Sequence, residues 1–289
     1  MRKYVFVSKG QTCDNYGRRY DFFIGFSDSI NNEHFSQKGK CYSYNDFENF
    51  IKKKKPKGVS FSFDLQDEFE YVISLICEYV TSMHLFPKPN ASFNLTALEN
   101  CSELTAIQFY WNTKQNTLWD VKKNTKLKDF DMTDYYNVSD FSAFRGSSIE
   151  SLRLHGCNFL SSFTPKMHID DFSFIAEMPY LKELRFAIIK DEPSEYYLNI
   201  LVKCQNLEIL RPTDSFFTFQ QFAWLKAHMP NVKEGLEGVE NIIYFSVIGR
   251  RTPKSLTDAS KAEKYQKRYD ALVEKYKNRN NPPSDDEKD

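Results

Sequence analysis

The side chains best able to do chemistry in this chain are its cysteines and histidines, and their spacing matches no reactive motif. None of the five histidines has the HExxH spacing of a zinc protease, and the six cysteines form no CxxC pair. The patterns GxSxG, P-loop and GxGxxG, which hold a nucleophile or a nucleotide phosphate, are missing as well. We therefore expect a non-catalytic protein with no metal and no cofactor.

A catalytic alternative stays open near the start of the chain. Cys13, Asp14 and His34 could form a site within residues 1–66, because a nucleophile and its base meet in space rather than in sequence. The rest of the chain would then select the substrate. Cys13, His34 and Cys41 could instead surround zinc, although three separated ligands are a poor signal for such a site.

Charge and hydropathy exclude several classes of partner. The 39 basic and 39 acidic side chains cancel, so the net field favours neither nucleic acid nor an anionic membrane. No apolar run approaches the roughly 18 residues of a membrane span, and the short apolar run after Lys3 does not suit a signal peptide. We expect a cytoplasmic protein with reduced cysteines.

One basic run interrupts this balance. Residues 52–57 include five lysines, from Lys52 to Lys57. Such a run could bind nucleic acid, and binding would then depend steeply on salt. It also suits the solvated end of a helix, where cations interact favourably with the helix dipole.

A repeated apolar pattern predicts the fold. A triplet of apolar residues at relative positions 0, +3 and +5 occurs six times, with starts 24, 23, 22, 32 and 26 residues apart. The triplets start at Val80, Leu104, Leu127, Ile149, Leu181 and Leu207. Further apolar residues at −9, −6 and −3 are close to one face of a helix, and the +3 to +5 alternation is typical of a strand. Each unit is therefore predicted to contain a helix, a turn and a short strand.

Residues 149–159 resemble the leucine-rich-repeat consensus L-x-x-L-x-L-x-x-C/N-x-L. Cys157, and Asn112 in the unit that starts at Leu104, stand where that family has Cys or Asn, whereas the remaining units lose this residue. Over residues 71–232, the resemblance implies an α/β fold, a leucine-rich-repeat solenoid with a parallel inner sheet and outer helices. It also implies irregular curvature.

The flanking segments are predicted to cover the ends of this solenoid. Residues 1–66 should form a small α/β cap, with strands at 4–8, 20–27, 39–44 and 59–63 and a helix at 45–55. The predicted domains are an N-terminal cap at 1–66, repeats at 67–235, a C-terminal cap strand at 236–256, a helix at 257–278 and a disordered tail at 279–289.

The concave face of the predicted sheet is the expected working surface. Arg153, Arg185 and Arg211 should stack one strand apart, about 5 Å between neighbours, with an aromatic patch at the other end. The predicted partner-binding residues are Phe86, Tyr110, Trp111, Asp131, Arg153, His155, Arg185 and Arg211. The arginines are either neutralised by Glu150, Glu183 and Glu208 or countered by an acidic partner.

These observations predict a scaffold that recognises a protein, one with an acidic patch, on the concave face. Leucine-rich-repeat proteins generally work this way, and arginine and aromatic residues are common in interface hot spots. Such a protein could be a regulator, an adaptor or a toxin-neutralising protein. The alternatives are the enzyme described above and nucleic-acid binding through residues 52–57.

Overall fold

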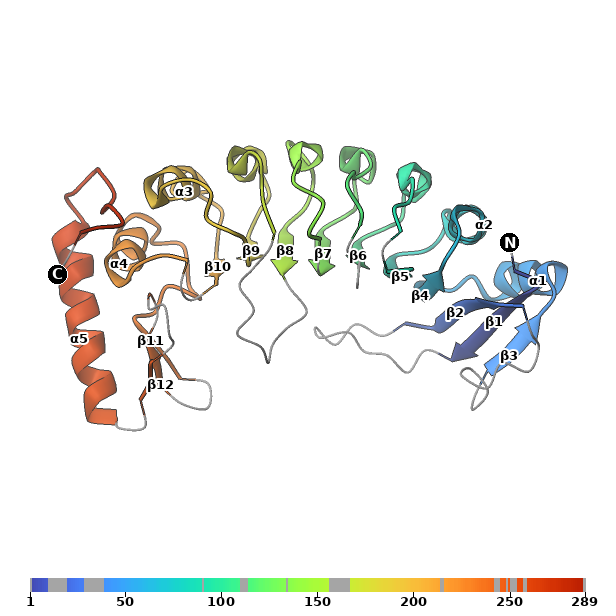
Figure 1. Cartoon of the computed structure of the whole chain (residues 1–289), viewed down its shortest axis with the longest axis horizontal. Helices are drawn as coiled ribbons and strands as arrows, with labels where there is room; N and C mark the ends of the chain where they lie inside the picture. The colour runs from blue at the N-terminus through green and yellow to red at the C-terminus, as the bar shows by residue number, and fades with distance from the viewer. Residues whose placement is uncertain are drawn as a thin grey trace.

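The fold is a mixed α/β arrangement built on one large, mostly parallel sheet. The computed structural model describes residues 2–9, 20–28, 39–89, 91–109, 114–133, 135–155, 167–213, 216–241, 245–247, 249, 254–256 and 259–287. Within these residues, ten strands form the sheet in the order β10-β9-β8-β7-β6-β5-β4-β2-β1-β3. The elements follow an arc, with helices and turns on its outer side and the strands on its inner side (Figure 1).

The first part of the chain forms one end of this sheet. Its elements are β1 (Tyr4–Lys9), β2 (Phe22–Ser27), β3 (Gly39–Tyr42), α1 (Tyr44–Lys54) and β4 (Gly58–Phe63). The predicted strands and helix are confirmed to within a few residues. Strand β1 pairs antiparallel with β2 and β3, whereas β2 pairs parallel with β4. This end therefore continues the large sheet without a break.

The repeated units form the parallel part of the sheet. The strands are β5 (Ser82–Pro87), β6 (Ala106–Phe109), β7 (Asp129–Thr133), β8 (Ser151–His155), β9 (Glu183–Phe186) and β10 (Ile209–Pro212). Each pairs parallel with the next strand along the chain. The six predicted strands are thus confirmed, because each +3 to +5 alternation buries its apolar side chains in the core.

The outer layer differs from the prediction in its middle. The α-helices are α2 (Gln66–Ile76), α3 (Ser194–Leu201) and α4 (Phe219–His228), but four units have only 3₁₀ turns: η2 (Thr96–Asn100), η3 (Val121–Lys123), η4 (Ser142–Phe144) and η5 (Phe172–Glu177). Apolar residues at −9, −6 and −3 repeat every three residues, a spacing that both a 3₁₀ helix and a short α-helix accommodate. The same spacing at Leu198, Leu201 and Cys204 accompanies the α-helix α3, so the pattern does not distinguish the two.

The core between sheet and outer layer is largely aromatic. Phe109 packs against Trp119 and Phe130, with ring centroids 5.9 Å apart in both pairs, and Phe130 meets Phe144 edge-on at 4.8 Å. Buried Asn124 ties neighbouring units together: its side chain accepts a hydrogen bond from the Trp119 indole at 2.6 Å and donates to two backbone carbonyls of the preceding unit. Abundant Phe thus replaces Leu as the main core filler.

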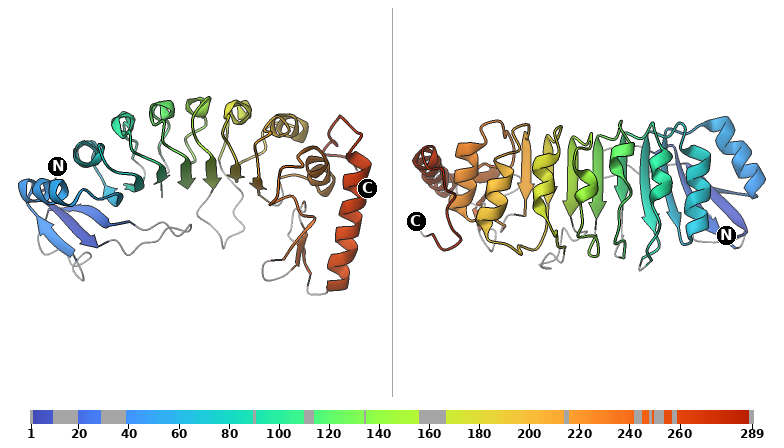
Figure 2. Two further views of the ribbon diagram at one scale, coloured as in Figure 1. Left: turned by 180° about the vertical axis from the view of Figure 1, so that it is seen from behind. Right: turned by 90° about the horizontal axis from the view of Figure 1, so that it is seen from above.

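The far end of the molecule carries a second, smaller sheet and a long helix. Strands β11 (Val239–Asn241), β12 (Phe245–Val247) and β13 (Lys254–Leu256) pair antiparallel, and α5 (Ala259–Tyr276) follows. The single predicted cap strand is therefore three short strands, while parts of residues 242–248 lie outside the described residues. Helix α5 runs beside this sheet and packs on α4 (Figures 1 and 2). Ala262, Tyr269 and Tyr276 of this helix are buried and lie at intervals of seven residues, so they share one face.

The predicted disorder of the tail is wrong for residues 279–287. This segment turns back from α5 and makes hydrogen bonds to α3 and α4, including one from the Trp224 indole to the Arg279 carbonyl at 2.9 Å. A polar, proline-containing sequence was expected to stay unfolded because it has little apolar surface to bury. In the structure, carbonyl and carboxylate oxygens of this segment accept hydrogen bonds from side chains of α3 and α4, and these hydrogen bonds hold the segment in place.

Across the described helices, none combines the length and the apolar character needed to cross a membrane.

Candidate interaction surface

The inner face of the sheet brings together most of the sequence-predicted site residues. Leu152 and Leu154 of β8 point into the core and are fully buried, so Arg153 between them points to the opposite face. The strand register places Arg153 beside Arg185 and Arg185 beside Arg211. On the other side, Arg153 neighbours Asp131, which neighbours Gln108. The predicted row across the sheet therefore exists.

Carboxylates of the same face surround Arg153, which is only 8% exposed. Its guanidinium donates to Asp129 at 2.7 Å and to both oxygens of Glu183, at 3.0 and 2.7 Å. Burial alone would raise the pKa of Glu183, but hydrogen bonds from Arg153 and Arg185 outweigh it and lower that pKa. Arg153 is thus a structural cation of the face, held between two neighbouring strands.

Arg185 and Arg211 are also paired, yet each stays about a third exposed. Arg185 donates to Glu183 at 2.5 Å, and Arg211 donates to Glu234 at 2.8 Å. Glu234 lies beyond the sheet edge and also approaches Arg185 at 3.9 Å. These carboxylates fix two guanidinium groups in place while leaving part of each open to solvent.

The predicted countercharges are therefore only partly correct. Glu183 does neutralise the arginine row, but Glu150 and Glu208 do not. Each of these precedes its strand and pairs with a lysine at that edge: Glu150 with Lys128 and Lys182 at 3.0 and 2.7 Å, and Glu208 with Lys233 at 2.6 Å. Three arginines meet Asp129, Glu183 and Glu234, so the row presents no excess positive charge.

The centre of the face holds a buried carboxylate. Asp131 is fully buried, and neither of its side-chain oxygens accepts a hydrogen bond from the described residues. His155 Nε2 lies 3.1 Å from Asp131 Oδ1, and the His155 side chain is 18% exposed. Gln108 Oε1 on β6 and Thr133 Oγ1 on β7 are also buried and have no hydrogen-bond partner among the described residues. The middle of the face is therefore polar but closed, with His155 at its surface.

Of the aromatic patch predicted at the other end of the face, Phe86 lies among the described residues. The Phe86 ring is half-buried and packs against His84 and Phe23, with centroids 4.1 and 6.3 Å apart. The contribution of β2 through Phe23 was not predicted, because only the strand order reveals that β2 lies near β5. Tyr110 and Trp111 lie outside the described residues.

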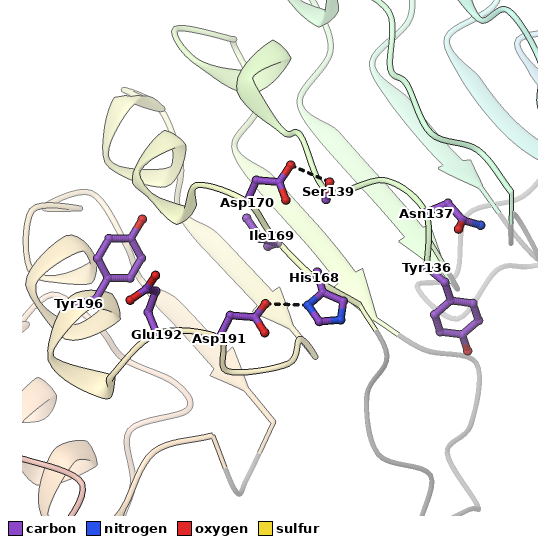
Figure 3. Close-up of a pocket in the computed structure, with 9 residues that line it drawn as sticks. All are labelled: Tyr136, Asn137, Ser139, His168, Ile169, Asp170, Asp191, Glu192 and Tyr196. Atoms are coloured by element: carbon purple, nitrogen blue, oxygen red, sulfur yellow. Dashed lines mark hydrogen bonds and ion pairs between the residues drawn. The ribbon is translucent and has the colours of Figure 1, made fainter.

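A hollow at the edge of the repeated units has no counterpart in the sequence predictions. It measures about 530 Å³, and its side chains come from the segments that follow β7, precede η5 and lead into α3 (Figure 3). His168 Nδ1 lies 2.7 Å from Asp191, and Ser139 donates to Asp170 at 2.7 Å. No spacing motif could have revealed it, because three separate units contribute. These two contacts pair the Ser139 hydroxyl with Asp170 and the His168 imidazole with Asp191, so they do not join a serine to a histidine base.

Two observations on the described residues concern metal binding and cysteine reactivity. Within the ranges that the structure describes, no three His, Cys, Asp or Glu side chains gather in a metal-binding group. Burial raises the pKa of the Cys101 and Cys204 thiols to about 12, so both stay protonated and unreactive near neutral pH. The proposed catalytic group of Cys13, Asp14 and His34 lies outside the described residues.

The basic run behaves as a helix end. Lys52, Lys53 and Lys54 form the last turn of α1, which terminates at Lys55 in the left-handed conformation. Lys52 pairs with Glu48 one turn earlier at 2.5 Å, and Lys57 donates to the Tyr79 carbonyl at 3.1 Å. These contacts favour the dipole-stabilised end over a nucleic-acid site.

No protein-family model matches this chain, and no curated protein is significantly similar to it in sequence.

Proposed function

We propose that this chain is a leucine-rich-repeat scaffold, without catalytic activity, that binds a protein on the inner face of its sheet. The proposal rests above all on the arc in Figure 1, in which successive parallel strands line the inner side and the helices and turns line the outer side. Four of the five spacings between stacked strand–turn units, 24, 23, 22 and 26 residues, agree with that family's repeat length of roughly 20–29 residues, and the fifth, 32 residues, is longer.

The inner face supplies two regions suited to a protein partner. Arg185 and Arg211 are held by carboxylates and partly exposed, so little side-chain entropy is lost when their remaining N–H groups bind. Phe86 offers a half-buried ring at the other end of the face. Arginine and aromatic side chains of this kind contribute strongly to protein interfaces.

The ion pairs change the expected chemistry of the partner. An unneutralised arginine row would demand an acidic patch, but Asp129, Glu183 and Glu234 already supply the countercharge. We therefore propose a partner that meets this face mainly through hydrogen-bond acceptors, such as backbone carbonyls, and through an apolar group near Phe86. A strongly acidic partner is not required.

The test uses a variant that spares the buried arginine. Arg185→Ala/Arg211→Ala removes the two exposed guanidinium groups, whereas replacing Arg153 would leave two carboxylates without their partner. The control is Lys122→Ala/Lys203→Ala, which removes the same charge from exposed positions of the outer layer. Partners are captured from the source cells with the unmodified chain, identified by mass spectrometry and purified.

The purified partner should bind the arginine variant at least tenfold more weakly than the control variant, as expected for loss of interface hot spots. Phe86→Ala should weaken binding as well. If both arginine and control variants fold and bind the partner equally, the inner face is not the binding surface.

A further inference from the structure

The segment of residues 279–287 occupies a strip of hydrogen-bond donors on α3 and α4. It follows α5 and turns back over these two helices at the end of the arc (Figures 1 and 2). Its hydrogen bonds with the two helices involve one side chain, that of Asp285, and the backbone carbonyls of Arg279, Pro283 and Glu287. Each of these four groups is a hydrogen-bond acceptor.

At α3, Asp285 acts as a helix cap contributed from elsewhere in the sequence. The residue before the helix, Pro193, makes no side-chain capping hydrogen bond. Instead, the Asp285 carboxylate accepts from the Ser194 backbone N–H at 3.2 Å and from the Ser194 hydroxyl at 2.5 Å. Lys190 Nζ lies 3.2 Å from the same carboxylate. An anion is favoured here both by the unpaired N–H groups of the first turn and by a nearby cation.

At α4, three side chains donate to the segment: Gln221, Trp224 and Gln220, whose amide donates to the Glu287 carbonyl at 3.5 Å. Gln221 is fully buried, and its amide donates to the Pro283 carbonyl at 3.1 Å and to Asp285 at 3.3 Å. The Trp224 indole donates to the Arg279 carbonyl at 2.9 Å. Four of these residues form the donor strip: Lys190, Ser194, Gln221 and Trp224. All of its contacts with the segment are donated by the strip and accepted by the segment.

Apolar burial holds the segment only weakly. Among residues 279–287, Pro283 alone is buried, and Asp285 is 42% exposed. A segment with few buried apolar contacts opens at a small fraction of the free energy of global unfolding. Opening would leave the buried Gln221 amide without these two acceptors, which is a costly state unless another chain supplies them.

We propose that the donor strip is a docking site for an extended acidic segment of another protein, and that residues 282–287 occupy this site until such a segment replaces them. The site selects acceptors because its contacts with the resident segment are all donated, and it selects a carboxylate because Ser194 and Lys190 converge on one position. It lies on the helices at the end of the arc, so it is separate from the inner-face function proposed above and does not depend on it.

The test supplies the segment as a separate peptide. The probe is a synthetic peptide of residues 280–289, prepared with its natural sequence, with Asp285→Asn and with Asp286→Asn. Asp286 is exposed, and no contact with the donor strip involves it, so its substitution is a control with the same change of charge. Binding is measured by calorimetry to the full chain and to a chain that ends at Asn280.

The shortened chain should bind the natural and Asp286→Asn peptides alike, and the Asp285→Asn peptide at least tenfold more weakly. The full chain should bind the natural peptide at least tenfold more weakly than the shortened chain, because its own segment competes. The proposal is overturned if the two substituted peptides bind equally, if full and shortened chains bind equally, or if the folded shortened chain does not bind.

A second pair of variants decides the matter if the shortened chain does not fold. Full-length Asp285→Asn should gain affinity for the natural peptide and show faster hydrogen exchange of the Ser194 backbone N–H, which donates to Asp285, whereas full-length Asp286→Asn should do neither. Equal affinity and exchange in these two folded variants would overturn the proposal. Inner-face binding of the captured partner should be unchanged in both, so failure of one proposal is distinguishable from failure of the other.

Discussion

Glu183 holds the arginine row together, and its replacement by glutamine tests that arrangement. The carboxylate is 13% exposed and accepts four hydrogen bonds: two from Arg153, one from Arg185 and one from Ser151. Glutamine has nearly the same shape but only one acceptor oxygen. The glutamine amide N–H2 is best placed beside the Ser151 hydroxyl, which can accept a hydrogen bond. The amide N–H2 then also faces an N–H of Arg153, so one charge-assisted hydrogen bond is lost and two donors oppose each other. The remaining contacts with Arg153 and Arg185 lose their ionic character.

The cost can be worked from these contacts. Hydrogen bonds to charged groups contribute about 1.5–3 kcal/mol each, and breaking a buried ion pair costs about 3–5 kcal/mol. Because Asp129 still pairs with Arg153 at 2.7 Å, we expect Glu183→Gln to lower the free energy of unfolding by about 3 kcal/mol. The control, Glu208→Gln, removes the same charge from a solvent-exposed pair with Lys233 and should cost less than about 1 kcal/mol.

Urea denaturation at neutral pH measures both variants, with the slope m checked for constancy. The Glu183 effect should also depend on pH. The pKa of Glu183 is lowered in the folded protein, so its stabilisation is fully present above the unfolded pKa of about 4.3. That stabilisation is lost as the pH falls towards the folded pKa, and the natural protein and Glu183→Gln should converge. If the two variants differ by under about 0.5 kcal/mol at neutral pH, Glu183 does not organise the arginines.

Three further perturbations probe other parts of the molecule. Asp131→Asn should raise the free energy of unfolding by roughly 1 kcal/mol in urea denaturation, because it removes a buried charge without hydrogen bonds; a loss would show that the contact with His155 dominates. Asn124→Ala should lower it by about 3 kcal/mol, since three buried hydrogen bonds disappear; a loss below about 1 kcal/mol would contradict this. The pKa of Asp285 is lowered to about 2 against an ordinary value of 3.8, where hydrogen bonds from Ser194 outweigh burial. Its contribution should thus be complete above pH 3.8 and vanish towards pH 2, seen as faster exchange of the Ser194 backbone N–H, which donates to Asp285; exchange that changes no more than the intrinsic rate over this range would contradict the assigned contacts.

The strands could be predicted from the sequence because each apolar triplet fixes which side of a strand faces the core. Ile149, Leu152 and Leu154 define the register of β8, and once the neighbouring triplets align, Arg153 must lie beside Arg185. The type of helix in the outer layer could not be predicted in the same way. Its apolar residues recur every three positions, a spacing that a short α-helix and a 3₁₀ turn both accommodate.

The charge pairing could be predicted only in part. Glu183 lies within β9 two residues before Arg185, so its side chain shares the face of the arginines. Glu150 and Glu208 directly precede their strands, where lysines of neighbouring units are closer than any arginine. Glu234 could not be assigned from periodicity, because it follows the last triplet and reaches β10 through a single bridge.

Amino-acid composition alone could not predict that residues 279–287 are ordered. Residues 279–287 contain Pro, Ser, Asp and Glu, which is typical of unfolded chain. Their order depends on Ser194 and Gln221, which lie more than 60 residues earlier in the sequence. The sequence of the segment itself therefore could not predict these hydrogen bonds.

The consecutive pairing of strands β4 to β10 has a consequence for how this molecule folds and comes apart. Every strand meets the strand that follows it in the chain, so the stabilising contacts of a unit are almost entirely with its two neighbours. Assembly can start at any adjacent pair and spread in both directions, one unit at a time, as in other linear arrays. Heating should erode such a molecule from its weakest boundary, and the segments on either side of that boundary need not melt together.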